Sequence, residues 1–169
     1  MVKWQTQPAI ECSEALDSLL NAVAFFTHPD QYTRSAQLQG KISSIPRYER
    51  SRDLLKTWPS ISMGVTWVIN RLTLPHRDRG GMDTTYDYIA LSGSAKAAMF
   101  LRDLGLHIRY ERSDVVALTG RILTHEVGAW EAGDRVCSVR YLKGDVFRAL
   151  DVPQPAWSTV EQVSTMLGL

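Results

Sequence analysis

The sequence predicts a mainly β protein with flanking helices, an α+β fold, and three observations support this prediction. Eight of the eleven glycines lie between residues 64 and 133, where they separate short apolar segments. Within those segments apolar and polar side chains alternate, as they do in strands. On both sides of this region, apolar residues recur instead at helical spacing. Several short strands with turn signals between them indicate a β sandwich or a jelly roll with helices around it.

Helices are expected first, over residues 1–60. The helical spacing of apolar residues begins behind Ser13, which we expect to be an N-cap. A second helix is expected after His28, with Pro29 in its first position. Residues 46–56 are charged and are expected to form a short helix or turn. The apolar residues at helical spacing in the first helix are Leu16, Leu19, Leu20, Val23 and Phe26.

The β core is expected over residues 61–143. In the first strand Met63, Val65, Trp67 and Ile69 share one face, while polar Thr66 and Asn70 lie on the other with Val68. Six strands follow from this kind of alternation, over residues 63–69, 86–91, 95–101, 106–111, 114–119 and 135–141.

Two further helices are expected over residues 144–169. They cover residues 144–150 and 158–167, and the second begins with Ser158 and Glu161 at capping-box spacing. A chain of 169 residues fits one domain, so we expect residues 1–169 to form a single unit of fold.

Composition and charge exclude several classes of protein. With 19 Lys+Arg against 18 Asp+Glu, the net charge of +1 excludes a protein that binds nucleic acid mainly through a diffuse positive field. No apolar run approaches the ~20 residues needed to cross a bilayer, and the first residues lack a secretory pattern. Cys12 and Cys137 match no zinc spacing and make no disulfide framework. We therefore expect an intracellular, reducing location and no membrane association.

The histidines indicate a metal site. Non-haem Fe(II) oxygenases use two imidazoles and one carboxylate on one face of the metal. His76 and Asp78 follow the strand over residues 63–69 and precede a Gly-Gly turn, and His125 follows the strand over residues 114–119. His76 and Asp78 alone would also fit a polar turn after an edge strand. The strand, the turn and the later His125 together favour the metal site.

Arg135 opens the last strand and could hold the far end of a dicarboxylate as a bidentate pair. The other two histidines have simpler interpretations. His28 has the same spacing to Asp30, but it lies at an expected helix start. His107 lies on the polar side of its strand and is expected at the surface.

These residues resemble a known family. Residues 74–78, with His125 and the strand over residues 135–141, resemble the TET/JBP branch of Fe(II)/2-oxoglutarate dioxygenases, and the compact fungal members most of all. The likeness covers roughly residues 60 to 157. Its further motif residues are Asn70-Arg71, Gly80-Gly81, 115–118, Gly120-Arg121, Leu123, Val127, Trp130, 133–135 and 152–157.

The resemblance implies a dioxygenase domain with a double-stranded β-helix (jelly-roll) core. It implies Fe(II) bound by His76, Asp78 and His125, and 2-oxoglutarate held through Arg135. Arg71 and Asn70 are implied as further cosubstrate contacts. O2 is the remaining co-reactant, and the implied reaction forms succinate and CO2 while a substrate C–H bond is hydroxylated.

The resemblance also suggests a substrate. In the DNA-oxidising relatives an aromatic residue stacks on a flipped base, and Tyr141 occupies that position; Tyr141 also fits an ordinary strand aromatic that fills the barrel mouth. Lys143 stands where those relatives have a base-reading His, and Gly81 stands where they have a polar residue. The expected substrate is thus the methyl group of a 5-methylcytosine-type base in DNA, a DNA-demethylation activity, with the base-reading contacts changed.

Two alternatives remain open at this point. The near-neutral charge and the missing base-reading residues favour a small molecule or a protein side chain as substrate. A catalytically silent jelly roll that binds a partner is the second alternative. A basic run would contact DNA or form a solvated face; it consists of Arg47, Arg50, Arg52, Lys56, Arg71, Arg77 and Arg79. A DNA substrate implies a nuclear location, and any other substrate a cytoplasmic one.

Overall fold

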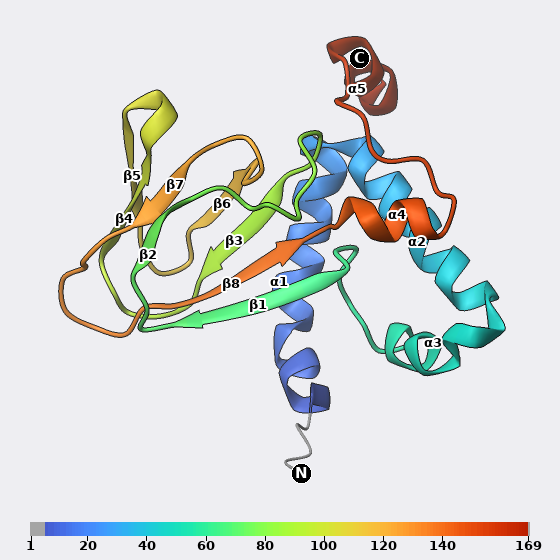
Figure 1. The fold of residues 1–169 in the computed structure, drawn as a ribbon, viewed down its shortest axis with the longest axis horizontal. Helices are drawn as coiled ribbons and strands as arrows, with labels where there is room; N and C mark the ends of the chain where they lie inside the picture. The colour runs from blue at the N-terminus through green and yellow to red at the C-terminus, as the bar shows by residue number, and fades with distance from the viewer. Residues whose placement is uncertain (1–5, 169) are drawn as a thin grey trace. The chain divides into compact units, whose positions relative to one another are not determined.

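The fold was analysed in a computed structural model that describes residues 6–168. Contacts between Cα atoms divide the chain into two compact units. One unit is Ser62–Gly144, and the other combines the residues up to Ile61 with those from Asp145 onward. Figure 1 shows the strands of the first unit and the helices of the second. The single domain over residues 1–169 stays a prediction.

The β unit consists of two antiparallel sheets of four strands each, counted over the described residues. One sheet has the order β1-β8-β3-β6 and the other the order β2-β7-β4-β5. The chain passes from sheet to sheet at almost every connection, and only β4 and β5 form a hairpin within one sheet. This order is that of a jelly roll. The strands are β1 (Gly64–Ile69), β2 (Thr73–His76), β3 (Asp87–Leu91), β4 (Ala97–Leu101), β5 (Leu106–Tyr110), β6 (Val115–Leu118), β7 (His125–Val127) and β8 (Val136–Tyr141).

An apolar core lies between the two sheets. Strands of both sheets contribute alternate residues to it, since successive side chains of a strand point to opposite faces. Removing this apolar surface from water is the main force that holds the sheets together. The core residues include Val68, Ile89, Leu91, Met99, Leu101, Tyr110, Leu118, Val127 and Cys137.

The predicted α+β jelly roll is confirmed, and so are its six predicted strands, within one or two residues at their ends. Two strands were not predicted, β2 and β7, and they change the position of both metal-site histidines. His76 ends β2 and does not follow directly on β1, because β1 ends at Ile69 and Asn70 turns the chain with a φ of +47°. His125 begins β7, which pairs with β2. Strands of three or four residues are too short to show alternation, and Pro75 argues against a strand.

The helical unit contains α1 (Thr6–Thr27), α2 (Pro29–Ser44), the 3₁₀ turn η1 (Pro46–Tyr48), α3 (Glu49–Leu55), α4 (Gly144–Ala149) and α5 (Val160–Leu167). Pro29 holds the first position of α2, as predicted, and the Gln31 N–H donates to Nδ1 of the N-cap His28 at 3.2 Å. Two details of the prediction are wrong. Ser13 lies inside α1, which already begins at Thr6. The capping box of α5 is formed by Thr159 and Gln162, one residue later than expected.

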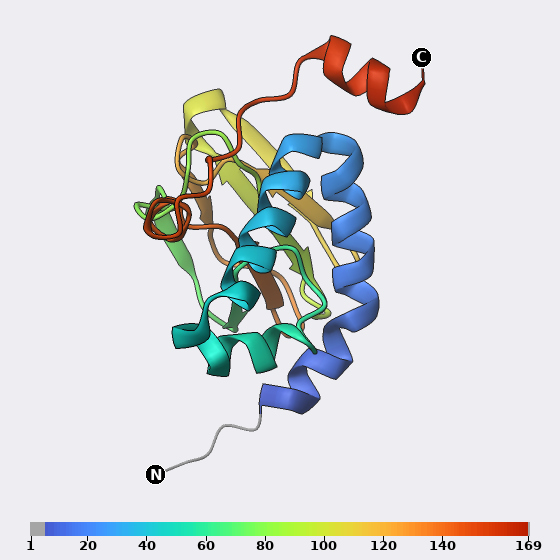
Figure 2. The same ribbon diagram turned by 90° about the vertical axis from the view of Figure 1, so that its right-hand side faces the viewer.

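Within this unit α1 and α2 pack side by side, which both ribbon views show (Figures 1 and 2). The imidazole of His28 stacks on the ring of Trp157, with ring centroids 5.1 Å apart. The backbone N–H of Ala156 donates to a carboxylate oxygen of Asp30 at 2.8 Å. The start of α2 therefore fixes the segment before α5, and His28 has a structural role here.

Candidate metal centre and its cavity

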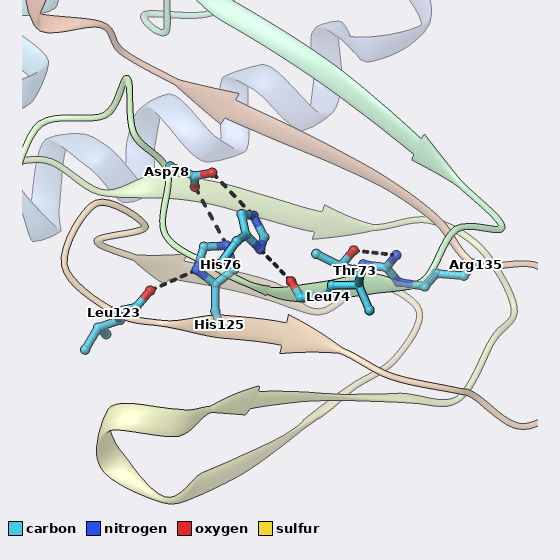
Figure 3. Close-up of polar contacts among 7 residues, drawn as sticks. All are labelled: Thr73, Leu74, His76, Asp78, Leu123, His125 and Arg135. Atoms are coloured by element: carbon cyan, nitrogen blue, oxygen red, sulfur yellow. Dashed lines mark hydrogen bonds and ion pairs between the residues drawn. The ribbon is translucent and has the colours of Figure 1, made fainter.

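Three side chains that lie far apart in the sequence meet at one point of the β unit. His76, Asp78 and His125 each offer one ligand atom, and these atoms lie within 4.8 Å of one another. Nε2 of His76 is 3.4 Å from one carboxylate oxygen of Asp78, and Nε2 of His125 is 3.7 Å from the other (Figure 3). Ligands bound at about 2.1 Å from one metal lie about 3 to 3.5 Å apart. The three groups are thus arranged as two nitrogens and one oxygen around a single metal position.

The pairing of β2 with β7 produces this arrangement. His76 lies directly opposite His125 in the register, and the pairing is irregular between Thr73 and His76. Asp78 is held two residues later, because its backbone N–H donates to the carbonyl of Gly120 at 2.9 Å. A Cβ at Gly120 would collide with the carboxylate oxygens of Asp78 and of Asp87. Glycine at this position allows the Asp78 carboxylate to face both imidazoles.

Hydrogen bonds orient both imidazoles. Nδ1 of His76 lies 2.9 Å from the carbonyl oxygen of Leu74, and Nδ1 of His125 lies 3.0 Å from that of Leu123 (Figure 3). A carbonyl oxygen only accepts, so each Nδ1 carries the hydrogen and each Nε2 keeps its lone pair. This is the arrangement that metal-binding histidines show, with the second nitrogen bonded to a backbone carbonyl.

Burial favours the neutral form of His125. His125 is 5% exposed, and its burial lowers the pKa of the imidazole; the nearby His76 lowers it further, and the bond with Leu123 and the charge of Asp78 oppose the shift. A neutral imidazole is the form that binds a metal. The environment of His125 therefore favours the ligand form at neutral pH.

The triad lines a cavity of about 310 Å³ in the β unit. The opposite wall of the cavity is one face of β8. Alternate residues of β8 and the residue before it, which are Arg135, Cys137, Val139 and Tyr141, all line the cavity. This strand connects two chemically different ends, with a guanidinium at one and a phenol ring at the other.

Arg135 is buried at the first end without a carboxylate partner among the described residues. It is 3% exposed, and its guanidinium donates to the Arg71 carbonyl at 2.6 Å and to the Thr73 hydroxyl at 3.3 Å. Its Nε has no hydrogen-bond partner. Burying a cation without an anionic partner costs free energy. An anion that binds at this end of the cavity would offset that cost.

Sequence reasoning missed Tyr110, which lies close to Arg135. Its side chain is fully buried, and its hydroxyl lies beside the Cys137 thiol. Burial raises the pKa of this phenol, with Cys137 as the next cause, while the charge of Arg135 opposes the shift. The hydroxyl therefore stays protonated. No sequence signal could have found Tyr110, because it continues the apolar face of β5.

Arg71 and Asn70 lie close to Arg135 but differ in what they face. Arg71 lines the cavity. Both side-chain groups of Asn70 bond within the protein, because Nδ2 donates to Asp134 at 2.8 Å and Oδ1 accepts from the Arg135 backbone N–H at 2.8 Å. The residues that line the cavity do not include Asn70. Asn70 thus joins the end of β1 to the start of β8 and sets the position of Arg135.

Tyr141 and Lys143 line the other end of the cavity. The Tyr141 ring lies against Gly64 of β1, where a Cβ would meet three of its atoms at 2.6–2.8 Å. The Lys143 ammonium lies 5.6 Å from the centre of the ring, at cation–π distance. The glycine therefore makes room for a phenol ring that lies over the strand.

Asp87 is the second residue that sequence reasoning missed. It begins β3, lines the cavity and is 5% exposed. Burial raises the pKa of its carboxyl to about 7; the charge of Asp78 acts in the same direction, and the Gly120 N–H that it accepts opposes the shift. A signal existed in the sequence, because alternation places Asp87 on the same face as the apolar Ile89 and Leu91.

The remaining expectations concern the surface. His107 is exposed and stacks on Phe100 at 4.3 Å, as predicted for a surface histidine. In the basic run, Arg52, Lys56 and Arg77 form ion pairs with acidic neighbours.

The side chains of Arg50 and Cys12 lie outside the described residues. Across the part of the chain that is described, none of the helices combines the length and apolarity needed to span a membrane.

Comparisons with known proteins were made by sequence and by structure. No family model matches the sequence, and neither does any curated protein. Among solved structures, NgTET1 in complex with 5mC DNA is similar with a TM-score of 0.48 and 14% identity, over 72% of this chain and 51% of that one. A Cupin 2 conserved barrel domain protein from Salinispora arenicola is similar with a TM-score of 0.39 and 13% identity, over 52% and 68%. The chain thus spans about half the length of the NgTET1 chain.

Proposed function

We propose that this protein is an Fe(II)/2-oxoglutarate-dependent dioxygenase of the TET/JBP type. It hydroxylates a C–H bond, and the substrate that we propose is the methyl group of a 5-methylcytosine-type base in DNA. The observation that carries this proposal is one cavity with a His-Asp-His triad on one wall and, on the other, a buried guanidinium that has no carboxylate partner among the described residues.

The donor set fits the proposed cofactors. Two imidazoles and one carboxylate on one side of a metal are typical of non-haem Fe(II) oxygenases, and they leave coordination positions open. The Arg135 guanidinium lines the cavity and has unused donor capacity, because its Nε has no hydrogen-bond partner. A dicarboxylate such as 2-oxoglutarate would satisfy it while its keto-acid end reaches the metal. When bound, these groups and O2 supply the oxidising chemistry, with succinate and CO2 as products.

The residues of the chain then have separate tasks. His76, Asp78 and His125 hold the metal, and the carbonyls of Leu74 and Leu123 keep both imidazoles in the tautomer that binds it. Arg135 binds the distal carboxylate, and Asn70 fixes its position through the backbone. Tyr141 offers a ring on which a flipped base stacks, a contact worth ~1–3 kcal/mol. Lys143, beside that ring, supplies a positive charge near the nucleic-acid backbone.

The ligand assignment is tested by spectroscopy under nitrogen. Protein mixed with Fe(II) and 2-oxoglutarate is expected to show a visible metal-to-ligand charge-transfer band. His76→Ala should abolish the band because it removes one of three ligands. His107→Ala is the matched control, an exposed strand histidine outside the cavity, and should keep it. A band that survives His76→Ala would contradict the assignment.

The substrate is tested separately by the formation of succinate. We expect DNA oligonucleotides with 5-methylcytosine to stimulate it above the level of unmethylated ones. A charge-transfer band without stimulation by any methylated oligonucleotide would exclude the nucleic-acid substrate and favour a small molecule or a protein side chain. Absence of the band would favour a binding protein without catalysis.

A further inference from the structure

Asp87 lines the cavity from β3, the strand next to β8. The register of β3 on β8 pairs Tyr88 with Arg140, and its continuation by one residue places Asp87 opposite Tyr141. Tyr141 is in turn paired with Gly64 of β1. Residues directly opposite one another in a sheet share a face, with Cβ atoms about 4.5–5.5 Å apart. Asp87, Tyr141 and Gly64 thus form one row across three strands.

The Tyr141 ring leaves the Asp87 side of this row open. Its outer ring atoms and hydroxyl lie over Gly64, on the β1 side. Asp87 lies on the opposite side of β8, and it lines the cavity together with Tyr141. The Asp87 carboxyl accepts the Gly120 N–H and lies near Asp78, so a planar ligand that extends across this cavity from the phenol ring can bring a polar edge to it.

The carboxyl has unused capacity to accept hydrogen bonds. Besides the metal-site Asp78, it is the one carboxyl among the residues that line the cavity. The backbone N–H of Gly120 donates to it, and no Lys or Arg of the described chain forms an ion pair with it. A carboxylate offers about four lone-pair positions, and buried polar groups are normally satisfied.

We infer that Asp87 is a specificity-determining residue, whose carboxyl accepts a hydrogen bond from an exocyclic amino group of the substrate ring. This inference rests on the proposed function and narrows its substrate to amino-bearing bases of the cytosine or adenine type. Thymine presents a carbonyl oxygen where 5-methylcytosine presents its amino group. That oxygen would place its lone pairs against those of the ionised Asp87 carboxylate. A buried acceptor that loses its donor in this way lowers the binding affinity strongly.

The test compares two single-stranded oligonucleotides that differ in one base, 5-methylcytosine or thymine. Both bases carry the 5-methyl group, and single strands need no duplex opening. Binding is measured at pH 8, where the carboxyl is ionised, by fluorescence anisotropy under nitrogen, with Fe(II) and 2-oxoglutarate and also in metal-free protein. We expect wild type to prefer the 5-methylcytosine strand about tenfold. Asp87→Asn should bring this ratio close to one, since an amide also donates to the thymine carbonyl.

Two controls separate selectivity from folding and from the cofactor chemistry. Asp83→Asn changes an exposed carboxyl in the same segment, which does not line the cavity, and should keep the wild-type ratio. A ratio unchanged by Asp87→Asn, or wild-type protein without a preference, would overturn the inference. The charge-transfer band reports independently on the proposed function. A normal band with no preference refutes only the role of Asp87, and a preference without a band refutes only the dioxygenase.

Discussion

At the scale of single residues, the cavity is defined by buried polar groups with too few partners. Nε of Arg135 lacks an acceptor at one end, and the Asp87 carboxyl accepts from the Gly120 N–H. In a folded protein such groups are few, because each unsatisfied group costs about 1–3 kcal/mol. They therefore mark where a ligand supplies the missing hydrogen bonds.

Arg135→Lys is expected to weaken 2-oxoglutarate binding about tenfold to a hundredfold. Lysine keeps the charge but loses the planar pair of donors that matches a carboxylate. It also loses the hydrogen bond to the Arg71 carbonyl that holds the guanidinium in place. Titration of the charge-transfer band with 2-oxoglutarate measures this change. The affinity for the metal alone should stay the same, and equal affinity for 2-oxoglutarate in both proteins would refute the role of Arg135.

Asp87 makes the stability of the metal-free protein depend on pH. Its pKa is about 7 in the folded protein and 3.8 in the ordinary, exposed state. Between these values the folded protein keeps a proton that the unfolded chain has released, so raising the pH favours unfolding. The full effect is on the order of 4 kcal/mol. Urea unfolding should show that the wild-type protein is less stable at pH 8 than at pH 5.

Asp87→Asn should remove most of this loss, because the amide does not titrate. Asp83→Asn serves again as control and should behave as wild type, since that carboxyl is exposed. Equal loss of stability in wild type and in Asp87→Asn would show that other groups cause the pH dependence.

At the scale of elements, the site depends on two short strands and one glycine. β2 and β7 bring the imidazoles together, and the missing side chain of Gly120 leaves room for the Asp78 carboxylate next to them. Gly120→Ala should therefore lower metal affinity at least tenfold, as changes around metal ligands do. Gly128→Ala is the matched control, because a Cβ there meets nothing within 4 Å. Metal titration of both variants measures the difference, and equal affinities would contradict this account.

The same elements show how far the sequence could predict the fold and the site. The longer strands were predictable because alternation over five or six residues is visible locally. β2 and β7 were not, since their existence depends on pairing between residues about 50 positions apart in the chain. The three triad residues were identified by residue type and spacing. Asp87 and Tyr110 were missed because their importance lies in what surrounds them after folding.

At the scale of the whole molecule, the proposed ligands would connect the two sheets of the jelly roll. The triad histidines belong to the sheet β2-β7-β4-β5, whereas Arg135 precedes β8 of the other sheet. A ligand that reaches from the metal to Arg135 therefore binds both sheets in the folded state and neither in the unfolded chain.

Fe(II) with 2-oxoglutarate should accordingly raise the thermal midpoint of unfolding under nitrogen. At a hundred times the Kd the stabilisation is about 2.7 kcal/mol, which corresponds to about 5–10 °C for a chain of this size. Pyruvate has the same keto-acid end but no distal carboxylate, so it should stabilise less. His125→Ala should show no shift with either acid. Equal shifts with pyruvate and 2-oxoglutarate would show that Arg135 does not take part.

The length of β8 also determines how far apart the two ends of the cavity lie. Arg135 and Tyr141 lie on the same face because their positions differ by an even number, six, and the strand rise of about 3.3 Å per residue sets their Cα atoms about 20 Å apart. An insertion of one residue between them would turn one of the two side chains out of the cavity. An insertion of two would keep the face and lengthen the cavity by about 7 Å. The length of this strand therefore sets the combined length of the proposed cosubstrate and substrate that the cavity accommodates.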